Sequence, residues 1–89
     1  MAISQMQIDK IVQIAKTYGI TRLIMFGSGV EMPEKARDID IACDGIKGWE
    51  FYEFAAKVED ELEMPLDIVS LYPPTRFTRY IETKGRILL

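Results

Sequence analysis

Apolar residues recur at helical spacing in two long stretches of the chain, residues 4–18 and residues 49–63. In the first stretch, Ser4 followed by Gln7 is typical of a helix-capping box, and Gly19 provides a natural stop. In the second stretch the inward-facing stripe consists of Phe51, Phe54, Ala55, Val58 and Leu62. The pattern therefore predicts two long amphipathic helices that each pack one face on a core.

Three shorter stretches predict β-strands. Residues 22–26 form a nearly continuous apolar run, which is typical of a strand buried on both faces. Residues 38–42 alternate strictly between acidic and apolar side chains, which predicts a strand with one wet face, and residues 66–71 form a third strand. Between the first two strands we expect a sharp turn at residues 27–29 and then a short helix or loop at residues 30–37.

The end of the chain adds one more helix. Thr75 is a suitable cap for a helix that runs through Thr83, and residues 87–89 form a short final strand or a tail. This order of elements predicts an α+β (mixed α/β) fold, with a small mixed sheet of three to four strands flanked by helices. At 89 residues we expect one domain, spanning residues 1–89.

Composition narrows the chemistry that such a fold can carry. The chain contains no histidine, which excludes Ser-His-Asp triads and histidine-ligated metals, and its single cysteine excludes an internal disulfide. Carboxylates, hydroxyls, lysines and arginines remain as candidates for catalysis. No apolar run is as long as a membrane helix and no signal peptide is recognisable, so we expect a cytoplasmic protein.

The net charge of −3 is unevenly distributed along the chain. Residues 31–69 are strongly acidic, and this region is either a solvated surface or a region that holds cations. Residues 70–89 are basic, and they form either a solvated surface or a contact for RNA, phosphates or an acidic partner. A tight general binder of nucleic acid presents a net basic face, so nucleic acid is not the favoured partner.

The most informative residues are three aspartates on the predicted strands. Asp38 and Asp40 are two positions apart in a strand, so both side chains point to one face while the intervening isoleucine points into the core. Close carboxylates repel one another, but their oxygens suit Mg²⁺ or Mn²⁺. Asp67 lies within an apolar strand and completes a triad on the same face if its strand pairs with that of Asp40. The alternative for all three is an ion pair with a basic side chain.

A Gly-Ser turn precedes these acids. Gly27 and Ser28 directly follow a buried strand, where glycine lets the backbone approach a ligand and nearby hydroxyl and N–H groups can hold a phosphate. The same residues are also compatible with an ordinary tight turn. Spacing excludes a Rossmann fingerprint, a P-loop and a calcium loop, because the further glycines, lysine and acids that these motifs need are missing.

Taken together, Phe26-Gly-Ser28, Asp38-Ile-Asp-Ile41 and Leu66-Asp-Ile-Val69 resemble the motifs of the DNA polymerase beta-like nucleotidyltransferase superfamily. Within it, the short chain is similar to the minimal nucleotidyltransferases (MNT), which are often partners of HEPN-domain proteins. The resemblance covers nearly the whole chain. It implies Mg²⁺- or Mn²⁺-dependent transfer of a nucleoside monophosphate from a nucleoside triphosphate, with ATP expected, to a hydroxyl acceptor.

The resemblance also assigns roles by position. Gly27 and Ser28 would bind the triphosphate, and Asp38, Asp40 and Asp67 would be the catalytic and metal-binding carboxylates. It further implies an antitoxin-like role with a HEPN-type protein partner, and an oligomer or complex, because so short a domain has no separate acceptor-binding domain.

The spacer between the Gly-Ser turn and the first acid departs from the family pattern. It lacks an early arginine and has Arg37 where a serine is expected, which leaves Lys35 or Arg37 to supply the positive charge. A second hypothesis is therefore a catalytically weak or inactive binding module that inhibits or scaffolds a partner protein. Mg·ATP binding that depends on the aspartates would distinguish the enzyme from the module.

Two further features concern packing. The aromatic residues at the start of the second long helix are expected in the core or at an interface, and they are Trp49, Phe51, Tyr52 and Phe54. Cys43 follows the second strand and is expected to be a small buried filler.

Overall fold

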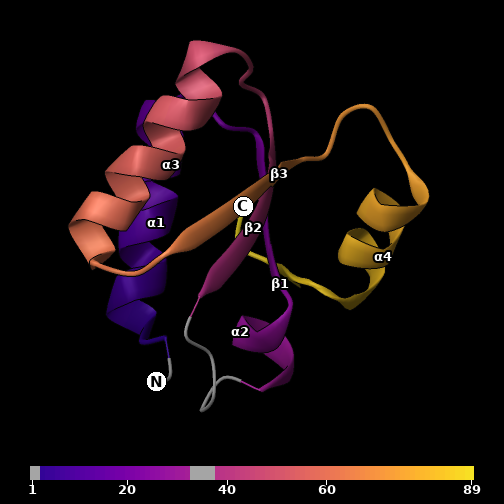
Figure 1. Ribbon diagram of the computed structural model, residues 1–89, viewed down its shortest axis with the longest axis horizontal. Helices are drawn as coiled ribbons and strands as arrows, with labels where there is room; N and C mark the ends of the chain where they lie inside the picture. The colour runs from indigo at the N-terminus through magenta and orange to yellow at the C-terminus, as the bar shows by residue number, and fades with distance from the viewer. Residues whose placement is uncertain (1–2, 33–37) are drawn as a thin grey trace.

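The computed structural model describes residues 3–32 and 38–89, and it contains a four-stranded mixed sheet with helices on both faces (Figure 1). In chain order the elements are α1 (Gln5–Thr17), β1 (Arg22–Phe26), α2 (Ser28–Glu31), β2 (Ile39–Asp44), α3 (Trp49–Leu62), β3 (Leu66–Ser70), α4 (Arg76–Lys84) and β4 (Arg86–Ile87). The strand order is β3-β2-β1-β4. β1 is antiparallel to β2 and β4, whereas β2 and β3 are parallel. The expected α+β fold is confirmed.

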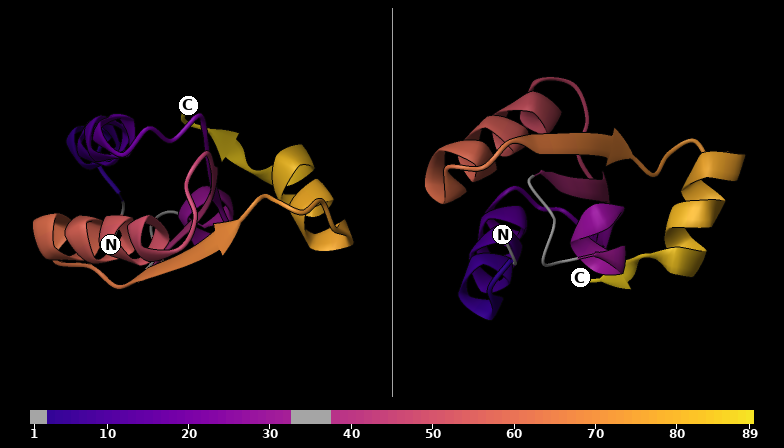
Figure 2. Two further views of the ribbon diagram at one scale, coloured as in Figure 1. Left: turned by 90° about the horizontal axis from the view of Figure 1, so that it is seen from above. Right: turned by 60° about the horizontal axis from the view of Figure 1, so that its bottom comes forward.

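Each face of the sheet carries its own apolar core. α1 and α3 cover one face, where Ile11 and Phe54 are fully buried, and α4 covers the opposite face through Ile81. Figure 2 shows the two long helices on one side of the sheet and α4 on the other. Because side chains alternate along a strand, β2 directs Ile41 toward the two long helices and Asp40 toward the α4 side.

The second strand differs from its prediction in its bounds. β2 begins at Ile39, one residue later than predicted, and extends two residues further, to Asp44. It is longer because its last two residues remain paired with Leu23 and Arg22 of β1. Asp38 therefore lies just before the strand rather than within it.

The turn after β1 is tighter than predicted. Gly27 alone makes it, with a φ of 74°, and α2 begins at Ser28, where a three-residue turn is predicted. Two backbone N–H groups of α2 donate to the Gly27 carbonyl, each at 3.0 Å. Residues 33–37 of the spacer lie outside the described residues. They include Lys35 and Arg37, the candidates for the missing positive charge.

The aromatic residues of α3 divide into two groups. Phe54 is fully buried and contacts Tyr18 edge to face, and Phe51 is partly buried. Trp49 and Tyr52 are 86% and 70% exposed, so of the expected core or interface positions the core position is wrong for these two, and the interface position stays a prediction. Their side chains lie on the outer side of α3, away from the stripe that packs on the sheet.

Cys43 fills the core as expected. It is buried, and burial, together with the charge of Asp44, raises the pKa of its thiol to about 11. Within the part of the chain that the structure describes, no helix has the length and apolar character that a membrane span requires.

The predicted N-terminal caps of α1 and α4 are present. In α4 the Thr75 hydroxyl accepts from the Thr78 N–H at 3.1 Å, and the Thr78 hydroxyl accepts from the Thr75 N–H at 2.8 Å. Ser4 and Gln7 make the same reciprocal pair at the start of α1. These caps satisfy N–H groups that a helix otherwise leaves without a partner.

Removing the α4 cap has a measurable cost. Thr75→Ala is expected to lower the free energy of unfolding by about 1 kcal/mol, because the Thr78 N–H loses its acceptor. Thr83→Ala is a matched control, since Thr83 is exposed and bonds only within the helix, and it should cost less than about 0.5 kcal/mol. Urea unfolding followed by circular dichroism measures both. Equal costs for the two variants would contradict the role of the cap.

Candidate active site

The sheet brings two of the predicted acids directly together. Asp40 in β2 and Asp67 in β3 are register partners in parallel strands, so the condition under which Asp67 joins Asp40 is met. On the other side of β2, Asp40 is the register partner of Phe26 in β1. Asp38 is exposed just before β2, close enough for its charge to act on Asp40. The structure thus pairs Asp40 with Asp67 at one end of the sheet and places Asp38 within electrostatic range of Asp40.

Asp40 is the most perturbed of these carboxylates. Partial burial raises its pKa, and the charge of Asp67, a side-chain hydrogen bond with Asp67 and the charge of Asp38 raise it further. Among the described residues, the ion pairs lie elsewhere: Lys10–Glu61, Lys57–Glu61 and Arg22–Glu82. A carboxylate held in such surroundings is a functional-site candidate, because a bound cation would relieve the repulsion.

Gly27 is packed against Asp40 so closely that no other residue fits. A Cβ atom at Gly27 would lie 2.4 Å from Oδ2 of Asp40, and the φ of +74° is itself unfavourable for a side chain. The Gly-Ser turn therefore lies beside the acids, as the motif resemblance implies. Ser28 follows as the first residue of α2, and its role at phosphate stays a prediction.

The donor set at this site is compatible with Mg²⁺ under one condition. Within residues 3–32 and 38–89, no three Asp, Glu, His or Cys side chains are arranged so that they alone could hold a metal ion. Mg²⁺ is usually held by one or two carboxylates plus substrate phosphates rather than by a cage of protein ligands. The paired oxygens of Asp40 and Asp67 are compatible with that mode of binding, in which a nucleotide completes the coordination.

The α4 helix contributes two residues that the sequence pattern did not single out. Phe77 contacts Phe26 edge to face, with ring centroids 5.7 Å apart and an interplanar angle of 85°. The Tyr80 hydroxyl donates to Oε1 of Glu31 in α2 at 3.3 Å. Their spacing along the helix could have indicated a shared face, but nothing in the sequence indicates that this face meets β1 and α2.

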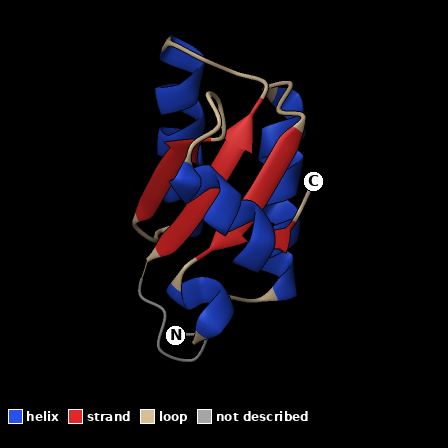
Figure 3. Ribbon diagram, turned by 90° about the vertical axis from the view of Figure 1, so that its right-hand side faces the viewer, coloured by secondary structure: helices blue, strands red, loops and turns tan. Residues whose placement is uncertain are grey.

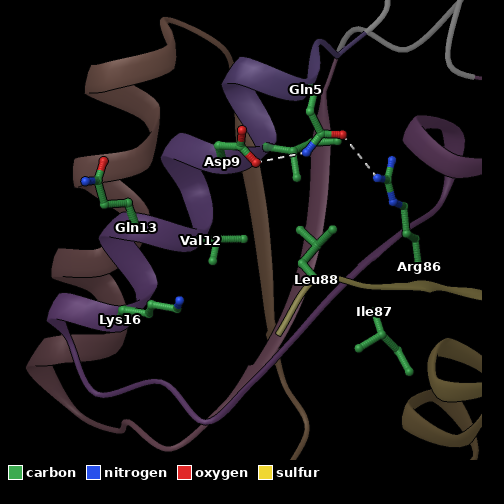
Figure 4. Close-up of a pocket in the computed structure, with 9 residues that line it drawn as sticks. Gln5, Asp9, Val12, Gln13, Lys16, Arg86, Ile87 and Leu88 are labelled. Atoms are coloured by element: carbon green, nitrogen blue, oxygen red, sulfur yellow. Dashed lines mark hydrogen bonds between the residues drawn. The ribbon is translucent and has the colours of Figure 1, made fainter.

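A cavity of about 650 Å³ lies away from the carboxylates, between α1 and the C-terminal segment (Figure 4). Gln5 crosses its rim, donating to Asp9 at 2.9 Å and accepting from Arg86 at 3.4 Å. The other residues that line it are apolar except for two polar residues of α1, and they are Ile8, Val12, Gln13, Lys16, Ile87 and Leu88. None of the predicted site residues lines this cavity.

Comparisons of the sequence find no matching family model and no matching curated protein. Comparison of the structure finds solved toxin-antitoxin complexes. One contains AMP-PNP (24% identity, TM-score 0.76, covering 92% of this chain and 72% of the solved chain). Another is a tri-AMPylated Shewanella oneidensis HEPN toxin in complex with MNT antitoxin (22% identity, TM-score 0.75, covering 98% and 72%). A third is the toxin-antitoxin MntA-HepT (23% identity, TM-score 0.73, covering 97% and 72%).

These likenesses cover almost the entire chain, and at such identities they establish the fold. The chain has the fold of the minimal nucleotidyltransferases, as the motifs around Gly27, Asp40 and Asp67 predict.

Proposed function

We propose that this chain is an Mg²⁺-dependent nucleotidyltransferase that moves AMP from ATP to a hydroxyl on a HEPN-type partner protein. The observation that carries the proposal is the register pairing of Asp40 with Asp67 beside Gly27. The raised pKa of Asp40 supports it, because it marks a carboxylate group that gains from a bound cation. The solved complexes support it by fold, since one contains AMP-PNP and another contains an AMPylated HEPN toxin.

In the proposed reaction the acceptor hydroxyl attacks the α-phosphorus, a new P–O bond forms, and the bond to pyrophosphate breaks. Gly27 and Ser28 would hold the phosphate chain. Asp40 and Asp67 would hold Mg²⁺ together with the phosphates, with Asp38 as the predicted third carboxylate, and the ion would neutralise phosphate charge and help to orient the in-line attack. The carboxylate of Asp67 is exposed, which suits it to receive the proton of the acceptor hydroxyl.

A binding module without catalysis is the second candidate. Trp49 and Tyr52 leave large aromatic surfaces exposed on α3, and such side chains are enriched in protein–protein interfaces. In this alternative, the chain binds its partner tightly through surfaces of this kind, and the aspartates are not needed.

Labelling separates the two candidates. The chain is purified with its HEPN-type partner and incubated with α-labelled ATP, with Mg²⁺ in one sample and a chelator in the other. We expect label on the partner only when Mg²⁺ is present. A stable complex in which the partner acquires no label would contradict the enzyme and favour the module.

A further inference from the structure

Two aromatic side chains on α4 remain exposed although the helix is packed. Phe77 and Tyr80 are 49% and 47% exposed, whereas Thr78 and Ile81 on the same helix are buried against the sheet. Residues three apart lie on one helical face, so Phe77 and Tyr80 form a single aromatic face of α4. About half of each of these two residues stays exposed, so aromatic area on this face is available for another contact.

The aromatic face of α4 borders the carboxylate site. Phe77 touches Phe26, and Phe26 is the register partner of Asp40 on the next strand. Tyr80 is tied to Glu31, which belongs to the short helix that begins directly after Gly27. Figure 3 looks onto the sheet from the α4 side and shows α4 in front of the strands. Only one aromatic ring therefore separates Phe77 from the strand position of Asp40.

We propose that Phe77 is the surface on which the nucleobase of the bound nucleoside triphosphate stacks. The inference rests on the proposed function, because it needs the phosphates of the nucleotide to lie at Asp40, Asp67 and Gly27. From there the base must extend to one side, and the aromatic face is the apolar surface next to Phe26. The edge-to-face contact fixes the Phe77 ring while about half of the residue stays open to a ligand.

A nucleobase fits the exposed face of Phe77 better than a side chain of a partner protein does. Phe77 lies one ring away from the strand position of Asp40, and a magnesium nucleotide brings a cation, phosphates and a flat ring in one molecule. Every base presents a π-face, so stacking on a phenyl ring tolerates different bases. The chemical class recognised here is thus a nucleoside triphosphate, with ATP and GTP bound to similar extents by this contact.

Calorimetry with two probes tests the inference on the full chain. The probes are the magnesium complex of a non-hydrolysable ATP analogue and that of inorganic tripolyphosphate, which has phosphates but no base. Phe77→Leu should weaken binding of the analogue about tenfold, which corresponds to a modest stacking contribution, and should leave binding of tripolyphosphate unchanged. Phe77→Trp should retain affinity for the analogue. Trp49→Leu, which alters an exposed aromatic residue on α3, should change the affinity for neither probe.

The outcomes separate this inference from the proposed function. If Phe77→Leu weakens binding of both probes equally, or weakens binding of neither, the stacking role is wrong while the nucleotide site stands. If it weakens only the complex with a HEPN-type partner, the aromatic face is a protein contact and the inference is overturned. If the wild-type chain binds neither probe, the proposed function fails as well. Thermal melting of each variant confirms that a loss of binding is not a loss of folding.

Discussion

Asp40→Asn is expected to reduce labelling of the partner by about 100-fold or more. Substitutions that disturb only the support of a metal ligand cost about 10- to 100-fold, so neutralising a central ligand should cost at least as much. Asp40 is central because it lies between Asp67 on one side and Gly27 on the other. Single-turnover labelling with saturating Mg·ATP measures the effect.

The same substitution should not weaken the fold. The folded-state pKa of Asp40 is raised, so the native chain holds this proton to higher pH than the unfolded chain does. Wild-type stability attributable to Asp40 is therefore lost as pH rises through that raised pKa, and above it the carboxylate opposes folding. Asp40→Asn should leave the free energy of unfolding at neutral pH unchanged or higher, and should flatten its dependence on acidic pH.

A distant aspartate provides the control for this result. Asp60 is exposed on α3, and Asp60→Asn should leave labelling unchanged. If Asp40→Asn kept full activity, or if both variants lost activity equally, the carboxylate site would be wrongly placed. A lower free energy of unfolding for Asp40→Asn would instead contradict the inference that the charged Asp40 carboxylate opposes folding.

Gly27→Ala is expected to cause the second large loss of activity. The new methyl group would overlap Oδ2 of Asp40, so the carboxylate must move away from its position beside Asp67. The substitution also places a side chain at a φ of +74°, which costs roughly 1–2 kcal/mol of stability. We expect labelling to fall about 100-fold, as for Asp40→Asn, because the same carboxylate is displaced rather than removed.

Gly19→Ala serves as a control that separates the conformational cost of a side chain at positive φ from the overlap with Asp40. Gly19 has a φ of +78°, and a Cβ atom added there would meet no atom within 4 Å, so Gly19→Ala carries the conformational cost without the overlap. Urea unfolding should show a loss of about 1–2 kcal/mol for Gly19→Ala with activity intact. Equal activity in the two alanine variants would show that the contact between Gly27 and Asp40 is not needed.

The carboxylate pair could be predicted from the sequence because strict alternation decides it. In residues 38–41, acids and isoleucines alternate, and the buried isoleucines fix the face on which Asp40 lies. Asp67 likewise interrupts an apolar strand, but its register with Asp40 comes from the structure and not from the sequence pattern. The roles of Gly27 and Ser28 at phosphate, and of all three acids at metal, remain predictions.

Other features depended on contacts that sequence patterns do not contain. β2 runs on to Asp44 although the alternation stops at Ala42, because pairing with β1 continues. Trp49 begins α3 outside the stripe that packs on the sheet, and aromatic character alone did not reveal that it is exposed. The face of α4 that carries Phe77 meets the site because the chain crosses to the far side of the sheet after β3.

The position of β3 at the edge of the sheet has a consequence for the size of the acceptor. No described strand lies beyond β3, and Asp67 on it is exposed. If the proposed function holds, a hydroxyl carried by a large folded protein could approach Asp67 sideways, past the sheet margin. Under that proposal, the shape of the partner would be the feature that selects which hydroxyl reacts.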